Sequence, residues 1–329
     1  MMAIKQALLD RNELNRKVVL VPDSAHGTNP ATAAFLGFEV KTIKSDEKGL
    51  IDFSDFKNNI DENFAGVMIT NPNTCGLFET DIVKISELTH ESGGYLYCDG
   101  ANFNAVVGKL KPGDLGIDAM HINLHKTFST PHGGGGPGSG PVVFSDRLEK
   151  FCPTPLVKNI KGDFVLIEDS NEKDLSKSFG RLNVFHGQMG MFVRAMSYML
   201  SHGCDGLKQV SEDAVLNANY LRASLSSHLT PAFDGFCMHE VLFSDDFLKD
   251  TGVETLDFAK AMIDEGYHPM TIYFPLVIHG ALLVEPTETE SKQSLDHFIK
   301  TLCDLVERLK KDSDSFKAAP LFTPIRRLD

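Results

Sequence analysis

The stretch INLHKTFSTPHGGGGPG, from Ile122 to Gly138, indicates the fold class of this protein of 329 residues. A strand-like apolar run, Met120–His125, leads directly into Lys126, and a chain of glycines follows. Parallel α/β sheets bind their ligands beyond the carboxyl ends of the strands, and glycine lets the backbone approach a ligand closely. The stretch therefore predicts an α/β protein in which a buried Lys126 takes part in a ligand site.

The composition of the chain excludes several classes of protein. With 42% hydrophobic residues it can bury a sizeable core, and its net charge of −13 argues against nucleic acid or an anionic membrane as a partner. The six cysteines form no C-x-x-C pair, so neither a zinc ribbon nor a dithiol redox motif is indicated. No apolar run reaches about 18 residues and the N-terminus is too polar for a signal peptide, so we expect a cytoplasmic protein.

Short apolar strands alternate with helical segments in the first part of the chain. The helical segments are Asn29–Phe38, a helix that begins at Asp52, and Asp81–Gly94. The expected strands are Val18–Pro22, Glu39–Lys44, Ala65–Thr70 and Tyr95–Gly100. This order predicts a mostly parallel sheet with helices on both faces.

The pattern becomes less regular after Ser145. Two helical segments, Phe185–Gly203 and Ser211–Leu229, precede a strand, a helix, a pair of strands and a final helix at Glu290–Lys311. We expect a large domain over residues 1–205 and a smaller α+β domain over residues 206–329, packed closely because no linker separates them.

Four polar residues stand at or just after the ends of four strands of the predicted sheet. They are His26, Asn71, Asp99 and Lys126. Each alone is ordinarily a cap, a turn or a surface group. Together they match the needs of pyridoxal phosphate: a lysine amine for its Schiff base, a carboxylate at its ring nitrogen, a donor at its phenolate oxygen and a flat group over its ring. Lys126, Asp99, Asn71 and His26 fit these roles in that order.

The chemistry of that cofactor explains two of these choices. An ion pair with Asp99, shielded from water, keeps the pyridine nitrogen protonated and makes the ring an electron sink. Burial and the cationic cofactor both disfavour the ammonium form of Lys126, which makes its amine a better nucleophile.

Seven motifs along the chain carry a resemblance to a known family. They are SAHGTNPA, TNPNTCGLFE, CDGANFNA, HINLHKTFSTPHGGGGPG, CMHE, HPMTIYFPL and EPTETESK. Together they resemble the glycine decarboxylase (P-protein) of the glycine cleavage system, in particular the C-terminal subunit of its two-subunit form. The resemblance runs from about Lys17 to Asp329.

The resemblance implies a fold-type-I, pyridoxal phosphate-dependent transferase-like fold and a reaction. Glycine is decarboxylated, and its aminomethyl group passes to the lipoyl arm of H-protein. Because the disulfide of that arm is reduced, the enzyme is formally an oxidoreductase, named glycine dehydrogenase (aminomethyl-transferring). The expected catalytic residues are Lys126, His26 and Asp99. The expected cofactor-binding residues are Lys126, Asp99, Asn71, His26, Thr28, Ala101 and His125. An N-terminal P-protein subunit in a heterotetramer, or a second copy in a homodimer, is the implied partner.

The glycine run suggests how the lipoyl arm reaches the site. We expect His132, Gly133, Gly134, Gly135 and Gly136 to form the mouth of a tunnel for the arm. A tight passage into the next strand is the alternative. Gly133, Gly135 and Gly138 also spell G-x-G-x-x-G, but the strand-to-helix setting and distal acid of a dinucleotide site are absent.

A metal site is the competing interpretation of the residues before Lys126. His121, Asn123 and His125 alternate along the expected strand and so share one of its faces. No third ligand lies at a suitable spacing, so we expect no metal.

Relative to the family, the chain lacks well over a hundred residues before its first strand, including the loop that cups the cofactor phosphate. We therefore expect an N-terminally incomplete large domain. Three hypotheses follow: an active subunit completed by another chain, a weak or inactive fragment that serves assembly, and another fold-type-I enzyme, such as an aminotransferase, that uses a keto acid.

Overall fold

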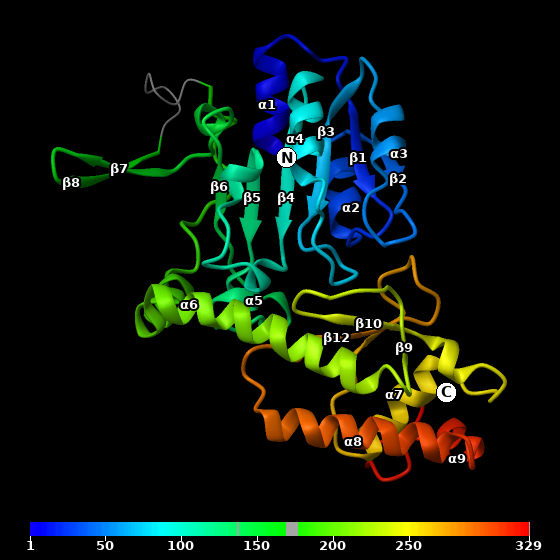
Figure 1. Ribbon diagram of the computed structural model, residues 1–329. Coiled ribbons are helices and arrows are strands. Elements are labelled where there is room, and N and C mark those ends of the chain that lie inside the picture. Colours follow the sequence, from blue (N-terminus) through cyan, green and yellow to red (C-terminus); the bar gives the residue numbers. More distant parts are fainter. Residues whose placement is uncertain (137, 169–176, 329) are drawn as a thin grey trace.

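A six-stranded sheet forms the first part of the computed structural model, which describes residues 1–136, 138–168 and 177–328 (Figure 1). Its strand order is β2-β1-β3-β4-β5-β6, and all neighbours are parallel except β5 and β6. The strands are β1 (Val18–Pro22), β2 (Glu39–Ile43), β3 (Phe64–Thr70), β4 (Tyr95–Gly100), β5 (Ala119–Ile122) and β6 (Val142–Phe144). The mostly parallel α/β sheet predicted from the sequence is confirmed.

Helices cover both faces of this sheet, which is why every residue of β1 and β3 is buried. The helices are α1 (Met2–Asp10), α2 (Thr28–Phe35), α3 (Phe53–Asn58) and α4 (Ile82–Glu91). Val19 and Val21 pack with residues of α1 and α2 on one face, and Leu20 packs with residues of α3 and α4 on the other. Asp52 caps α3 by accepting the backbone N–H groups of Ser54 and Asp55, as the sequence predicted.

The strand expected over Met120–His125 is shorter than predicted. β5 ends at Ile122, opposite the last residue of β4, so no neighbouring strand continues the ladder beyond it. Asn123 then begins the one-turn helix α5 (Leu124–Thr127). Lys126 therefore lies on a helical turn, and the expected alternation of His121, Asn123 and His125 along one strand face is wrong.

A second, antiparallel sheet faces the carboxyl ends of the parallel strands (Figure 1). Its order is β11-β12-β10-β9. The strands are β9 (Thr230–Pro231), β10 (Val241–Ser244), β11 (Thr271–Ile272) and β12 (Leu282–Val284), and the accompanying helices are α7 (Thr255–Asp264), α8 (Lys292–Leu309) and α9 (Ser313–Ala318).

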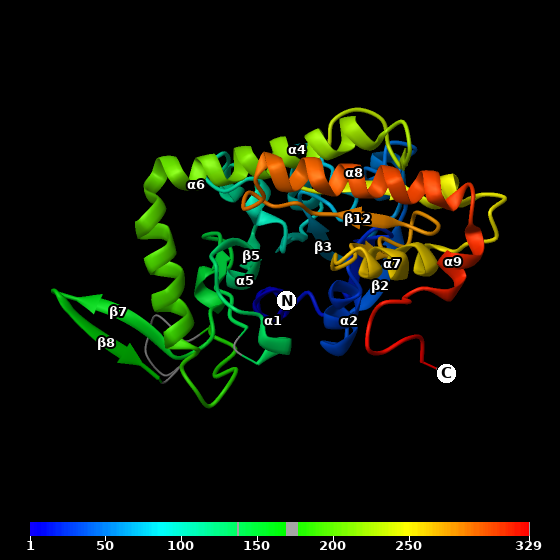
Figure 2. The ribbon, with the colours of Figure 1, turned by 90° about the horizontal axis from the view of Figure 1, so that it is seen from below.

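Helix α6 (Met189–Leu225) connects the two regions and bends sharply at Gly203, whose φ is 62° and ψ −174° (Figure 2). A side chain is rarely tolerated at that backbone geometry, so glycine permits the bend. The two helical segments expected from the sequence are the two arms of α6. Residue 205, where we place the end of the large domain, lies just after the bend, and this division stays a prediction.

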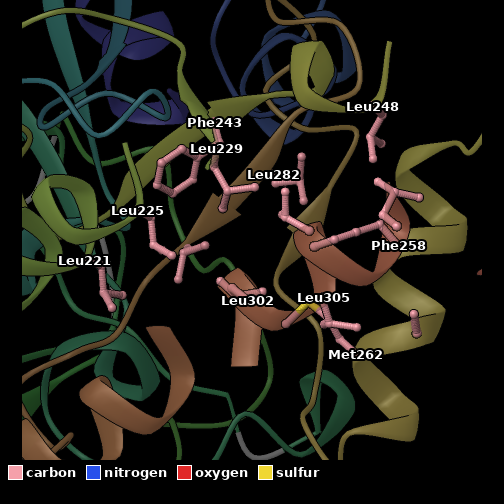
Figure 3. Packing of buried hydrophobic residues seen from close by; sticks show 14 of the residues in the cluster. Leu221, Leu225, Leu229, Phe243, Leu248, Phe258, Met262, Leu282, Leu302 and Leu305 are labelled. Carbon is pink, nitrogen blue, oxygen red and sulfur yellow. The ribbon is translucent and has the colours of Figure 1, made fainter. Parts of the chain in front are cut away.

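The core of the second region lies between its sheet and α6, α7 and α8. Figure 3 shows Leu225 of α6, Phe243 of β10, Phe258 of α7 and Leu302 of α8 gathered in one buried cluster. Each of these four side chains is fully buried. This packing fixes β10 and β12 opposite the first sheet.

The remaining elements lie outside these two layers. The hairpin of β7 (Leu156–Ile160) and β8 (Asp163–Ile167) extends away from the body of the molecule (Figure 1). Short 3₁₀ turns occur at Phe103–Ala105, Pro112–Leu115, Gly133–Gly135, Glu149–Phe151 and Asp245–Leu248. Within the described residues, no helix combines the length and the apolar character needed to cross a bilayer.

Candidate functional site

A cavity of about 560 Å³ lies where the carboxyl ends of the parallel strands face the second sheet. Its volume is in the range of small-molecule and cofactor sites. Seven of the predicted site residues line it: His26, Thr28, Asp99, Ala101, His125, Lys126 and His132. Segments far apart in the sequence thus bring most of the predicted residues to one place, as expected at the carboxyl edge of a parallel sheet.

Asp99, the next-to-last residue of β4, is held firmly at the wall of this cavity. Its carboxylate accepts the backbone N–H of Ala101 at 2.9 Å and the side-chain amide of Asn29 at 3.2 Å. The residue is only 5% exposed, so a cation that reaches the carboxylate would be poorly screened by water. Ala101 contributes a backbone group rather than a side chain.

A hydrogen-bonded group of three residues, Tyr97, His121 and Asn123, lies beside Asp99. Nε2 of His121 lies 3.3 Å from Asp99 Oδ1 and 3.0 Å from the amide oxygen of Asn123. Nδ1 of His121 lies 2.5 Å from the hydroxyl of Tyr97. Burial raises the pKa of Tyr97, so its hydroxyl keeps its proton. His121 is thereby fixed against the carboxylate, with its two ring nitrogens engaged by polar side chains.

His26 lies at the opposite wall, just before α2. Its Nδ1 accepts the backbone N–H of Thr28 at 3.2 Å, and its ring meets Phe274 edge-on with 5.8 Å between the ring centroids. The His26 ring is otherwise exposed to the cavity. A flat group can therefore lie against one of its faces.

Lys126 is exposed in the structure, and the burial expected for it from the sequence is wrong. The reason is its position on α5, which turns the residue out from the end of β5 and toward the cavity. No hydrogen bond or ion pair holds its amine among the described residues. A free amine at the wall of a cavity is available to a ligand.

Asn71 does not line the cavity. It lies at the end of β3, 6% exposed, and its amide oxygen accepts the backbone N–H of Glu79 at 3.0 Å. Its amide nitrogen has no partner within the described residues. The buried hydroxyls of Thr70, Thr127 and Thr130 also have no partner there, and of these three residues Thr70 lines the cavity. Buried polar atoms are nearly always paired in proteins, so the hydroxyl of Thr70 indicates a polar group that the cavity receives.

The predicted glycine loop lies at the surface. Gly133, Gly134 and Gly136 are exposed, and Gly133–Gly135 forms a 3₁₀ turn in which Gly134 has a φ of 66°. Gly133, Gly134 and Gly136 do not line the cavity, but His132 does and packs edge-on against His125, with 4.7 Å between the ring centroids. The loop thus adjoins the cavity through His132, and its role in admitting a lipoyl arm stays a prediction.

Two carboxylic acids of the second region were not predicted. Glu240 precedes β10 and Glu285 follows β12, and both line the cavity. Asn102 donates to Glu240 at 3.4 Å and Asn104 donates to Glu285 at 3.0 Å, so the turn after β4 holds both acids. The signal was available in the motifs CMHE and EPTETESK, which contain these residues.

Two family models and many curated proteins match this chain. The model of the glycine dehydrogenase C-terminal domain matches residues 210–319, and that of the class-V aminotransferases matches residues 1–153. A probable glycine dehydrogenase (decarboxylating) subunit 2 of Caulobacter vibrioides is 60% identical over 100% of this chain and 63% of its own length. The protein of the same name from Kosmotoga olearia is 51% identical over 100% of the chain and 67% of its own length. The chain thus spans about two thirds of these relatives.

Solved structures show the same fold. A glycine decarboxylase (P-protein) of the glycine cleavage system, in inhibitor-bound form, superposes with a TM-score of 0.74 over 92% of this chain and 68% of its own, at 21% identity. A sphingosine-1-phosphate lyase of Burkholderia pseudomallei gives a TM-score of 0.70 over 94% and 67%, at 16% identity. These matches confirm the predicted fold type I.

The P-protein fold and the class-V aminotransferase model together imply pyridoxal phosphate as the cofactor. The relatives match this chain from end to end at about half of its positions or more, which is far beyond a likeness of fold alone. The chain belongs to the family of glycine dehydrogenase (decarboxylating) subunit 2.

Proposed function

We propose that this chain forms the pyridoxal phosphate site of a glycine dehydrogenase (decarboxylating), which releases CO2 from glycine and passes the aminomethyl group to the lipoyl arm of H-protein. The observation that carries this proposal is one cavity in which Asp99, His26 and the free amine of Lys126 face a common space.

The residues of the cavity fit the cofactor. Asp99 is a buried carboxylate, suited to the protonated ring nitrogen, and the exposed face of His26 is suited to the ring. Thr70 lines the cavity with a hydroxyl that has no partner within the described residues, and the amide nitrogen of Asn71, the next residue, is also unpaired. These donors suit an anionic oxygen of the cofactor, such as its phenolate or phosphate.

Pyridoxal phosphate supplies, when bound, an electron sink for the pair of electrons released as the bond between the α-carbon and the carboxylate of glycine breaks. The chain's own residues prepare this step. Asp99 holds a proton at the ring nitrogen, where negative charge develops. Lys126 offers its amine to the cofactor's carbonyl carbon, and His26 covers the ring and excludes water from that face.

The lining of the cavity favours decarboxylation over transamination. No arginine is among the described residues that line it, whereas Glu240 and Glu285 are. An arginine would stabilise the negative charge of the substrate carboxylate, whereas the acidic side chains of Glu240 and Glu285 do not stabilise it. Loss of the carboxylate removes its negative charge, so an environment that leaves this charge unstabilised favours that loss over its retention.

Assembly is part of the proposal. The relatives are named subunit 2, and the chain spans 63% of the first of them and 67% of the second. We propose that the chain acts together with the other subunit, rather than as an inactive fragment, and that glycine and a lipoylated H-protein are its substrates.

The test is release of labelled CO2 from carboxyl-labelled glycine, measured with the chain, the other subunit, pyridoxal phosphate and lipoylated H-protein. The proposal requires release that depends on all of these components. Transfer of the amino group to a keto acid, without CO2, would show that the chain is an aminotransferase instead. A chain that binds the cofactor but supports neither reaction would be the assembly subunit of the alternative hypothesis.

A further inference from the structure

Glu240 and Glu285 form a close pair of carboxyl groups on the wall that faces Lys126. With His239, they place three ligand atoms within 4.8 Å of one another. Nε2 of His239 lies 3.9 Å from an oxygen of Glu240 and 3.8 Å from an oxygen of Glu285. The side chain of Glu240 is 7% exposed, whereas that of Glu285 is 42% exposed and opens into the cavity.

Neither carboxyl group has a cationic partner within hydrogen-bonding distance among the described residues. His239 is fully buried, both of its ring nitrogens are unpartnered, and burial lowers its pKa to about 3, so it is neutral. The amides of Asn102 and Asn104 are neutral donors. Two carboxylates so close together, one of them buried, cannot both be ionised without a large cost, so such pairs share one proton.

Burial and neighbouring carboxylates raise the pKa of both acids, and the charge of Lys126 acts against them. Burial, followed by the charge of Glu285, raises the pKa of Glu240 well above its ordinary value, and Lys126 opposes this. Burial also raises the pKa of Glu285, with a small contribution from Glu288, whereas the hydrogen bond from Asn104 and the charge of Lys126 lower it. Burial raises the pKa of the nearby thiols of Cys75 and Cys237, so they stay protonated.

The reaction of the proposed function needs such a proton. When the aminomethyl carbon forms its bond to one sulfur of the cyclic disulfide, the bond between the two sulfurs breaks. The second sulfur leaves with the electron pair of that bond. An aliphatic thiol is a weak acid, so this sulfur needs a proton to leave readily. The overall step thus consumes one proton, and CO2 carries away the carboxylate.

We propose that Glu240 and Glu285 hold one proton between them and deliver it to the sulfur released from the lipoyl disulfide, after which water restores the proton. The inference rests on the proposed function. It places the lipoyl arm on the side of the cavity to which the side chain of Glu285 is exposed. A divalent cation bound by His239 and the two acids is disfavoured, because Lys126 acts as a positive charge on all three groups.

The shared proton is tested first without cofactor or substrate. Infrared spectra of the chain at neutral pH are expected to show a carboxylic acid band that Glu240→Gln removes. Glu79 is a second buried acid, with a pKa raised to about 7 by burial, so Glu79→Gln assigns its separate band. Glu290→Gln, an exposed change in the segment after β12, is the control and leaves the spectrum unchanged.

A spectrum without a band that depends on Glu240 would overturn the proposal, whether or not the chain decarboxylates glycine. Zinc or manganese that binds the wild-type chain stoichiometrically, but not Glu240→Gln, and abolishes the band would show a metal site instead.

Delivery to sulfur is tested with two disulfides in the complete system. Loss of a general acid costs about 100- to 10,000-fold. With the lipoyl disulfide, Glu240→Gln and Glu285→Gln are expected to slow aminomethyl transfer by about 100-fold or more. A disulfide with an acidic thiol leaving group needs no proton, so the variants are expected to be within about tenfold of wild type with it. If the variants lose the same factor in the rate of aminomethyl transfer with both disulfides, the two acids do not deliver the proton. The proposed function still stands in that case if the wild-type system releases CO2 from glycine.

Discussion

Replacement of Asp99 by asparagine tests the electrostatic core of the site. The amide keeps the size of the carboxylate, and its oxygen can still accept the N–H of Ala101, so we expect the fold to be retained. What it loses is the negative charge that holds a proton on the ring nitrogen of the cofactor.

The magnitude follows from the burial of the residue. An adjacent opposite charge shifts a pKa by about 1 to 3 units, and each unit corresponds to about 1.4 kcal/mol. Because Asp99 is 5% exposed, little screening is expected and the upper part of this range applies. We therefore expect decarboxylation to slow by about 100- to 1,000-fold in Asp99→Asn.

The assay is release of labelled CO2 from glycine by the complete system, with cofactor occupancy measured by absorbance on the same sample. Asp23→Asn is the matched control, because Asp23 directly follows β1 and, among the described residues, its carboxylate accepts hydrogen bonds only from Ser45. The control is expected to keep the wild-type rate. An Asp99→Asn protein that is fully loaded with cofactor and decarboxylates glycine at the wild-type rate would refute the reasoning.

Three further predictions concern the fold that holds the site. Gly76 has a φ of +75°, and a Cβ there would lie 2.2 Å from the backbone oxygen of Glu240. Gly76→Ala is therefore expected to lower Tm in thermal melts and to weaken cofactor binding in absorbance titrations. An unchanged Tm would contradict this prediction. Burial raises the pKa of Glu79 from 4.5 in the unfolded chain to about 7 in the folded protein, so protonated Glu79 stabilises the fold below pH 4.5, and this stabilisation is lost as the pH rises to about 7. In denaturant titrations at several pH values, Glu79→Gln is expected to remove about 3 kcal/mol of this pH dependence. Parallel pH profiles of the parent and the variant would contradict the prediction. Leu302 is fully buried in the core shown in Figure 3, so Leu302→Ala is expected to lower the free energy of unfolding by about 2 to 5 kcal/mol. Leu256 is exposed, and Leu256→Ala is expected to lower it by less than about 1 kcal/mol. Similar losses in the two variants would contradict the packing described.

The first sheet was predictable because each of its strands carries its own signal. Val18–Pro22 and Tyr95–Gly100 are short apolar runs, and the structure has both with the bounds expected. The end of β5 was not predictable in this way, since it depends on where its neighbour β4 stops. A local pattern does not contain the register of a neighbouring strand.

The residues of the site also differ in whether the sequence alone could place them. His26, Asp99 and Lys126 each lie at or just after the carboxyl end of a strand of one parallel sheet, so the topology alone brings them to one edge. Glu240 and Glu285 reach the cavity from the second sheet, and only the packing of the two regions places them opposite Lys126. The exposure of Lys126 was missed for a related reason, because it follows from the helical turn of α5.

The most direct test of the site is to identify the lysine that carries the cofactor. The protein is incubated with pyridoxal phosphate, reduced with borohydride and digested, and the modified peptide is mapped by mass spectrometry. We expect the pyridoxyl group on Lys126, and no modification of that peptide in Lys126→Ala. A pyridoxyl group on another lysine in the wild-type protein, with Lys126 unmodified, would contradict the assignment of this cavity as the cofactor site.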